Sequence, residues 1–522
     1  MATGAKMTVL ISPRHDAIVI PYRRDIHNLL PASLPFDHKG EEFLKITYGI
    51  EEVRLLNNLG IPTPAPILNK YNWPGLVPFE SQRKTSALLT TSKRAYVLSS
   101  MGVGKTRAAL FSFDFLLQQG AVKICLVVAP LSTLVPVWEV ETFESFYHLS
   151  VGVLHGTRAK RLKVLGEDHH IYVINHDGVS TIQKELLAKG FDCVVVDELA
   201  TYRNRRTNRW KAMRPIVTNA TYAWGLTGAP TPNGPTDAYG QVKLLTPSRM
   251  AMSFRAFQQS TMKQVSQFRW VPRPKANDIV HEAMQPSVRF SLEECHDLPP
   301  ITLSARDVPL SARQKKAYKQ LMSEYAMESK KAGVITVVNE AARLNKLLQV
   351  GAGFAYTREG KGEYLDAKAR LKTTLDLVRE APGKVIIFAS YKWAVAMLER
   401  VMEHVGGSLA ITGATSAGER NKSIALFRGA NSHRILVAHP GCMAHGVNLQ
   451  CASTIIWYTP THSLETYMQA NARITRPGQT QHMNIIHLTA TPVEKKIFKK
   501  LAKNEKVLGV LLDMFKAQEI GI

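Results

Sequence analysis

The chain has 522 residues, enough for about three domains of average size, and 45% of them are hydrophobic, as in globular proteins with substantial cores. Its 66 Lys and Arg residues outnumber 42 Asp and Glu residues, which gives a formal net charge of +24. This excess indicates a polyanionic partner, most often a nucleic acid, although charge alone leaves open a basic protein without one. Neither a signal-peptide pattern nor an apolar run of roughly 18 residues is present, which disfavours secretion and membrane insertion and predicts a cytoplasmic protein.

The cysteines are scattered along the chain, without a pair at the spacing of metal ligands. They are Cys125, Cys193, Cys295, Cys442 and Cys451. The first two lie inside apolar, strand-like segments, where cysteine behaves as a small hydrophobic residue. We therefore expect a reducing compartment, with neither a disulfide framework nor a zinc site.

Residues 1–78 are expected to form a separate small α+β region of unknown role. Met7–Ile11 and Ala17–Pro21 have the composition of two short strands, and Glu51–Leu59 is typical of a helix that stops at Gly60. A proline-rich linker follows. The region could dock a partner, contact nucleic acid or simply cap the first core.

Two longer stretches, residues 79–248 and 367–492, alternate short apolar segments with helical patterns. Each alternation predicts a parallel sheet covered by helices on both faces, so the fold class is α/β. Residues 249–366 are expected to form a helical connector, and residues 493–522 a basic amphipathic helix. The expected strands are Tyr96–Ser99, Lys123–Ala129, Ile171–Ile174, Cys193–Val196 and Ala223–Thr227, then Val385–Ala389, Ser408–Ile411, Ile435–Ala438, Thr454–Trp457 and Asn484–His487.

One segment of the connector, Phe268–Lys275, mixes aromatic and basic residues in a loop broken by proline. That composition suits base stacking and phosphate contact. An ordinary surface loop is an equally good interpretation of it.

A glycine-rich turn stands between the first predicted strand of residues 79–248 and the helix that follows it. Gly102 and Gly104 allow the turn, and the helix then begins with Lys105 and Thr106. Backbone N–H groups at a helix N-terminus bind phosphate, the lysine adds a charge for the β- and γ-phosphates, and the threonine hydroxyl is a Mg²⁺ ligand. Ser99 stands where this motif usually has Gly or Ala. The turn predicts a nucleoside-triphosphate site.

Two carboxylates, Asp197 and Glu198, follow directly after the apolar segment Val194–Val196. Such a pair is often an ordinary solvated strand end. Downstream of a phosphate-binding turn, however, Asp197 is expected to hold Mg²⁺ and Glu198 to orient the attacking water. The sequence therefore predicts hydrolysis of ATP with Mg²⁺.

Further segments complete a set of motifs that occurs in one order along the chain. They are Gln82, Val128–Ser132 with Trp138, the Asp-Glu-Leu-Ala box at 197–200, Leu226–Asn233, Gly413 and Thr415 with Arg420 and Phe427, Gly446–Leu449, and Gln469 with Arg473, Arg476 and Gln479. Together, from about Phe79 to Val493, they resemble the Swi/Snf-like branch of superfamily-two helicases and DNA translocases. The compact layout is most similar to bacteriophage-encoded members of that branch.

The resemblance implies two tandem RecA-like lobes with an ATP cleft between them. It implies nucleotide contacts from Gln82, Gly446 and Gln469, and catalytic arginines at Arg473 and Arg476. These two arginines are three residues apart and would face the same way on a helical turn. It implies DNA contacts from six further residues. They are Pro130, Ser132, Thr227, Gly228, Gly413 and Thr415.

The resemblance also implies a monomeric motor that acts on duplex DNA with little sequence preference. The motor would be located in the host cytoplasm if it is phage-encoded. Three features depart from the family pattern. Ala200 replaces the histidine of the Asp-Glu box, Ala444-His445 replaces a Gly-Gly pair, and Arg289 stands alone where a double-arginine patch is common. The coupling between ATP and nucleic acid must therefore involve other residues or be weaker.

Two other functions are consistent with the sequence. One is a strand-separating superfamily-two helicase on DNA or RNA, and the other is a scaffold that retains a relict nucleotide site. The complete set Lys105, Asp197, Glu198, Arg473 and Arg476 argues against the relict site. The pathway served, the polarity and the recruiting partner are not predicted.

Overall fold

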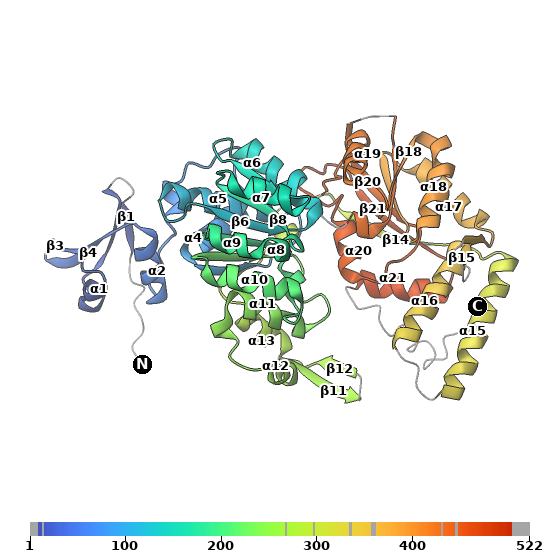
Figure 1. Cartoon of the computed structure of the whole chain (residues 1–522), viewed down its shortest axis with the longest axis horizontal. Helices are drawn as coiled ribbons and strands as arrows, with labels where there is room; N and C mark the ends of the chain where they lie inside the picture. Colours follow the sequence, from blue (N-terminus) through green and yellow to red (C-terminus); the bar gives the residue numbers. More distant parts are fainter. Residues whose placement is uncertain are drawn as a thin grey trace. The chain divides into compact units, whose positions relative to one another are not determined.

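The computed structural model describes residues 9–12, 15–266, 269–295, 298–332, 337–356, 362–429, 432–443 and 447–503 (Figure 1). The chain forms two compact units, Met1–Cys295 and His296–Ile522. Within the described residues, no helix combines the length and the apolar character needed to cross a bilayer.

The first unit begins with a small antiparallel sheet in the order β1-β2-β4-β3. The elements of this region are β1 (Leu10–Ser12), β2 (Ala17–Pro21), α1 (Arg24–Leu29), β3 (Leu34–His38), β4 (Glu41–Thr47) and α2 (Ile50–Asn58). The predicted strand Ala17–Pro21 is confirmed, whereas part of Met7–Ile11 lies outside the described residues. The β3–β4 hairpin was not predicted; its turn holds Lys39 and Gly40 at φ +56° and +83°, the left-handed pair that a two-residue hairpin favours.

The segment predicted as a proline-rich linker is packed rather than extended. Ile67 and Tyr71 are buried in the same core cluster as the large sheet, and a short helix, α3 (Ile67–Lys70), forms between the prolines. The Tyr71 ring packs edge-on against Phe111 and Phe115, and its hydroxyl donates to Asp114 Oδ2 at 2.5 Å. Apolar residues between the prolines account for this packing.

The large sheet of the first unit is wholly parallel, in the order β13-β5-β10-β9-β6-β8-β7. Its strands are β5 (Arg94–Val97), β6 (Cys125–Ala129), β7 (Val151–Leu154), β8 (Ile171–Asn175), β9 (Cys193–Asp197), β10 (Tyr222–Leu226) and β13 (Ser287–Val288). Along β9, Val194 and Val196 belong to one core cluster and Cys193 and Val195 to another. Both faces are therefore buried, as the apolar runs predicted.

The helices packed around this sheet precede its first strand or connect its strands (Figure 1). They are α4 (Glu80–Thr91), α5 (Lys105–Gln118), α6 (Val140–Ser145), α7 (Arg158–Gly166), α8 (Gly178–Thr181), α9 (Gln183–Lys189), α10 (Asn208–Asn219) and α11 (Ala238–Leu245). Short 3-10 turns at Leu131–Thr133, Leu199–Tyr202, Pro235–Asp237 and Pro247–Arg249 and a π-helical turn at Leu134–Glu139 connect them.

The stretch 249–366, expected to be a helical connector, contributes to both units. The first unit receives α12 (Phe254–Thr261), β11 (Met262–Ser266), β12 (Arg269–Pro272), α13 (Ala276–Ala283), β13 and α14 (Leu292–Cys295). The aromatic and basic stretch predicted as a loop forms the β12 side of a hairpin that extends from α12 (Figure 1). Arg273 donates to the carbonyls of Gln259 and Met262, so it fastens the hairpin to α12; Phe268 lies outside the described residues.

The second unit contains a six-stranded parallel sheet in the order β14-β21-β20-β17-β19-β18. Its strands are β14 (Ile301–Asp307), β17 (Lys384–Phe388), β18 (Ser408–Ile411), β19 (Ile435–Ala438), β20 (Ala452–Trp457) and β21 (Met483–Thr489). Its other elements are α15 (Ala312–Ala332), α16 (Val337–Ala352), β15 (Phe354–Tyr356), β16 (Gly362–Tyr364), α17 (Lys368–Glu380), α18 (Lys392–Gly406), α19 (Ala417–Gly429), α20 (Leu464–Asn471) and α21 (Pro492–Ala502). The rest of the predicted C-terminal helix lies outside the described residues.

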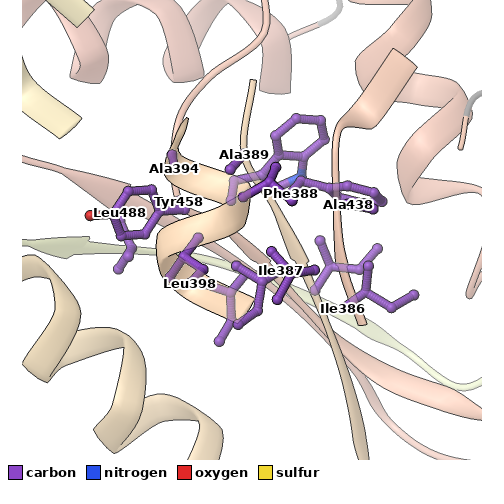
Figure 2. Packing of buried hydrophobic residues seen from close by; sticks show 14 of the residues in the cluster. Ile386, Ile387, Phe388, Ala389, Ala394, Leu398, Ala438, Tyr458 and Leu488 are labelled. Atoms are coloured by element: carbon purple, nitrogen blue, oxygen red, sulfur yellow. The ribbon is translucent and has the colours of Figure 1, made fainter. Parts of the chain in front are cut away.

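Side chains from the central strand β17 and from α18 form the middle of this core (Figure 2). Ile386, Ile387 and Phe388 are fully buried, as is Leu398 of α18. Two sheets of this kind, each with helices between parallel strands, confirm the predicted α/β class with tandem parallel-sheet lobes. The domain limits at 78, 248, 366 and 492 stay a prediction.

Candidate active site

The predicted phosphate-binding turn lies between β5 and α5. Gly102 and Gly104 have φ values of +86° and +80°, a left-handed backbone that residues with a side chain rarely adopt. The α5 helix begins at Lys105, so its first N–H groups, including that of Thr106, lie at the end of this turn. The Lys105 ammonium donates to the carbonyls of Ser99 and Ser100, at 2.8 and 2.9 Å. The four residues predicted to bind phosphate are thus in one turn.

Gln82 of α4 contacts this turn from the side. Its Nε2 donates to the Gly104 carbonyl at 3.3 Å, and its Oε1 accepts from the Phe79 N–H at 2.9 Å. A Cβ at Gly104 would lie 2.2 Å from Gln82 Nε2, so a side chain there would displace the Gln82 amide, and its positive φ favours glycine as well. The structure brings Gln82 to the phosphate-binding turn, while its contact with adenine stays a prediction.

Asp197 ends β9, near the same turn. Its Oδ2 accepts from the indole N–H of Trp138 at 3.1 Å, and its Oδ1 accepts from the Glu198 N–H at 3.0 Å. Burial raises the pKa of the Asp197 carboxyl, whereas the Trp138 N–H, the charge of Lys105 and the Glu198 N–H oppose that rise. In the sheet order β5-β10-β9, only β10 separates the strand that ends at Asp197 from the strand that precedes the turn, so both lie at one edge of the sheet.

Glu198 lies just beyond β9 with a left-handed φ of +54°, which is uncommon for a residue with a side chain. Its Oε1 accepts from the Thr227 hydroxyl at 2.9 Å. Thr227 follows β10, the parallel neighbour of β9, in which Leu226 is opposite Asp197. The strand register therefore places this hydroxyl beside the second carboxylate.

Thr227 and Gly228 were predicted to contact DNA, and the structure places both beside residues of the predicted nucleotide site. Thr227 is fully buried, and its hydroxyl accepts from the Ala229 N–H in addition to its bond with Glu198. A Cβ at Gly228 would lie 3.4 Å from Met101 of the phosphate-binding turn. The side chain of Thr227 is thus a partner of Glu198 and does not contribute to the exposed surface.

The other predicted nucleic-acid contacts lie at the carboxyl ends of strands. Pro130 follows β6, and Ser132 belongs to the 3-10 turn after it, next to the exposed Leu131. In the second unit, Gly413 follows β18 with open space around its Cβ direction. Thr415 accepts from the Thr412 N–H at 3.0 Å. Apart from Thr227 and Gly228, these positions are compatible with a ligand at the strand ends.

In the second unit, the prediction that Arg473 and Arg476 share a helical turn is wrong. The α20 helix ends at Asn471, and both arginines lie in the turns that follow. The backbone bonds there tighten to three-residue spacing, from Arg473 N to Ala470 O, and Pro477 then prevents the helix from continuing.

The two arginines have different surroundings. Arg473 is 2% exposed and donates to the carbonyls of Gln469 and Val447, at 2.8 and 3.0 Å. Arg476 donates to the Ala472 carbonyl at 3.3 Å. Burial lowers the pKa of Arg476 to about 10, with the charge of Arg428 acting in the same direction, so it stays protonated at neutral pH.

Of the remaining predicted nucleotide contacts, Gln469 is buried and its amide donates to Glu465 Oε1 at 3.3 Å. Gly446 lies outside the described residues.

Two contacts were missed by the sequence interpretation: Trp138 on Asp197 and Thr227 on Glu198. The contact of Trp138 with Asp197 was indicated only by the presence of a tryptophan close to the motif at Val128–Ser132, since a buried indole N–H requires an acceptor.

Comparisons with known proteins identify the family of this chain. Residues 88–351 match the SNF2-related domain and residues 368–478 the helicase conserved C-terminal domain. Protein p41 of Acyrthosiphon pisum secondary endosymbiont phage 1 is 26% identical over 447 residues, which cover 80% of this chain and 94% of p41. This similarity confirms the predicted likeness to compact phage-encoded proteins.

Larger proteins are similar as well. The CHD3-type chromatin-remodeling factor PICKLE of Arabidopsis thaliana is 23% identical over 85% of this chain, which spans 35% of PICKLE. The SWI/SNF-related regulator of chromatin subfamily A-like protein 1 of Xenopus laevis is 22% identical over 83% of the chain, which spans 44% of it. The Sulfolobus solfataricus SWI2/SNF2 ATPase core, solved in complex with dsDNA, is 20% identical with a TM-score of 0.41, covering 82% of this chain and 92% of that one.

Proposed function

This chain belongs to the SNF2-related family, and from that premise we propose that it is a monomeric motor that moves along duplex DNA in the cytoplasm. It is a Swi/Snf-like, nucleic-acid-dependent ATPase, as the matches to both family domains indicate. The observation that carries the proposal is the meeting of Lys105, Asp197 and Glu198 at the carboxyl end of one parallel sheet. Ligands of such sheets bind at that edge.

The donor set of the site fits Mg²⁺. A carboxylate and a hydroxyl are the hard oxygen ligands that this ion prefers, and Asp197 and Thr106 supply them beside the phosphate-binding turn. When bound, Mg²⁺ would neutralise charge on the β- and γ-phosphate oxygens. Lys105 holds the same phosphates from the helix N-terminus, and Trp138 and the Glu198 N–H fix the Asp197 carboxylate.

Glu198 is the residue that orients the attacking water. Its backbone is left-handed at φ +54°, and the bond from the Thr227 hydroxyl fixes the carboxylate oxygen Oε1. Arg473 and Arg476 supply positive charge for the transition state, and Gly446 and Gln469 contribute to nucleotide binding; these roles rest on the family motifs. Each is a separate, testable part of the proposal.

The track is the DNA backbone. Pro130, Ser132, Gly413 and Thr415 have small side chains, and all of them except Pro130 carry a backbone N–H. Such groups bind phosphates and carry no direct sequence information. The net charge of +24 supports long-range attraction to such a polyanion. We therefore expect little sequence preference and a steep fall of affinity with salt, roughly 10³–10⁵ between about 50 and 200 mM if six to ten phosphates are neutralised.

The test is ATP turnover measured without nucleic acid and with duplex DNA, single-stranded DNA or RNA. We expect duplex DNA to give the greatest stimulation, and the motor to displace a triplex strand faster than it unwinds a tailed duplex. Lys105→Ala should abolish turnover, and Glu198→Gln should bind ATP without hydrolysing it. Lys160→Ala removes the same charge as Lys105→Ala from an exposed helix position and should turn over ATP like the wild type. Stimulation by RNA above DNA, or efficient unwinding of the tailed duplex, would favour the strand-separating helicase.

A further inference from the structure

The loop that follows the Asp-Glu box is held rigidly against the sheet. Its first residue, Arg203, follows the buried Tyr202, whose hydroxyl is hydrogen-bonded to His176. A Cβ at Gly240 of α11 would lie 2.3 Å from the Arg203 carbonyl oxygen, so the two backbones are in direct contact. Within the loop, Asn204 accepts from the Arg206 N–H at 2.9 Å. The loop backbone is therefore fixed before any ligand binds.

This loop forms one wall of a pocket of about 390 Å³, within the range of small-molecule sites. We call it the arginine pocket. It is lined by Arg203, Asn204, Arg205, Arg206, Thr236, Asp237, Tyr239 and Phe254. All of these residues belong to the first unit.

The arginines of the pocket differ from neighbouring arginines in their ion pairing. Among the residues that the structure describes, no carboxylate lies within ion-pair distance of Arg203, Arg205 or Arg206. By contrast, Arg209 on the next helix pairs with Asp177, and Arg158 pairs with Glu185. Clustered guanidinium groups repel one another, and a concave site concentrates their field, so this pocket attracts a multivalent anion.

An aromatic side chain stands at the same site. Phe254, the first residue of α12, is 40% exposed and packs edge-on against the buried Tyr239 ring, at 5.3 Å between centroids. The Arg205 guanidinium also lies over the Tyr239 ring, 5.6 Å from its centroid. Tyr239 is thus the buried support for both groups, while Phe254 remains accessible to a planar partner.

We propose that the arginine pocket binds a single strand of nucleic acid, with phosphates at Arg203 and Arg206 and an unpaired base stacked on Phe254. Guanidinium groups bind phosphate oxygens in pairs, and stacking on an aromatic ring accepts any base. Asn204 and Thr236 add neutral hydrogen-bonding groups, and Asp237 keeps the pocket from being uniformly positive. This inference rests on the proposed function and adds a contact that lies outside the motif segments.

The place of the pocket in the chain suits it to influence hydrolysis. The wall formed by the arginine loop begins five residues after Glu198, and the wall that contains Thr236 follows the segment of Thr227 in the chain. Glu198 and Thr227 are hydrogen-bonded to each other, so both walls are connected through the backbone to this bond. The box lacks its usual histidine, with the buried Ala200 in that position. A strand in the arginine pocket can therefore supply the contact between nucleic acid and ATP that the missing side chain would have made.

The experiment measures binding of a fluorescent single-stranded DNA oligonucleotide and of a blunt duplex to the full chain, across a salt series. The double variant Arg203→Ala/Arg206→Ala should weaken single-strand binding by about tenfold or more and reduce the salt slope by roughly 1.4, for two phosphates. Phe254→Ala should weaken it by at least about fivefold without changing the slope, and Phe254→Trp should restore it. Neither Phe254 variant should alter binding of the blunt duplex.

The matched control is Arg158→Ala/Lys184→Ala, which removes two positive charges from exposed positions on the same unit outside the pocket. It should keep the wild-type slope, and thermal unfolding establishes that each variant is folded. Wild-type affinity and slope in the pocket double variant would overturn the inference, while the proposed function would stand. Loss of duplex binding in Phe254→Ala would overturn the stacking part. A wild-type chain that binds neither DNA would overturn the proposed function itself.

Discussion

The hydrogen bond between Thr227 and Glu198 allows a sharp test of the hydrolytic site. Thr227→Val keeps the shape and the β-branching of a fully buried side chain and removes only the hydroxyl. The lost bond is 2.9 Å long and has a carboxylate as its acceptor. A bond to a charged group contributes about 1.5–3 kcal/mol. If that contribution is needed when water attacks, kcat falls about 10- to 150-fold.

The assay is steady-state ATP turnover at saturating duplex DNA, with ATP affinity measured separately by a fluorescent analogue. We expect the loss in kcat with little change in affinity, because Thr227 contacts the carboxylate that orients water and not the phosphate-binding turn. Thr227→Ser keeps the hydroxyl and serves as the control, with turnover near wild type. Turnover within twofold of wild type in Thr227→Val, or equal losses in both variants, would refute the role given to this bond.

Three further outcomes are expected. Burial raises the pKa of the Asp197 carboxyl, so its ionised form destabilises the fold at pH values above the ordinary Asp pKa of about 3.9. Asp197→Asn should therefore lose ATP turnover and raise the thermal unfolding temperature at pH 7. The difference in unfolding temperature between variant and wild type should shrink as the pH is lowered toward about 3.9. Arg476→Ala should lower kcat and keep ATP affinity, whereas Arg473→Ala should also lower stability in urea unfolding, because two backbone carbonyls lose a buried donor. Arg370→Met should cost about 3–5 kcal/mol in the same unfolding assay, since it leaves the buried Glu494 carboxylate without its cation; a loss below 1 kcal/mol would contradict this.

The parts of the fold that the sequence predicted well are those with strong local patterns. Ser408–Ile411 and Ile435–Ala438 form strands with the predicted limits because short, buried apolar runs define them. The edge strand Ile301–Asp307 was missed, since most of its residues are exposed and its partner β21 lies far along the chain. The edge strand Val151–Leu154 was missed as well, although it is apolar and mostly buried.

The same division applies to the site. Lys105, Asp197 and Glu198 were predicted because each lies at or beyond the end of a strand, at a motif position. The bond from Thr227 to Glu198 depends on the register between two strands, which no local pattern encodes. The turn that separates Arg473 from Arg476 depends on tertiary bonds to the Val447 carbonyl, and helical spacing alone therefore gave the wrong geometry.

The packed segment before residue 79 determines how this protein can be divided in the laboratory or by recombination. A shortened chain that begins at Phe79 would remove Ile67, Tyr71 and Trp73 and leave the aromatic face of α5 open to water. That helix carries the phosphate-binding turn at its other end, so solubility and nucleotide binding depend on the same packing. A portable ATP-binding module has to include Ile67, Tyr71 and Trp73, and a fusion joined at residue 78 would separate two parts of one folding unit.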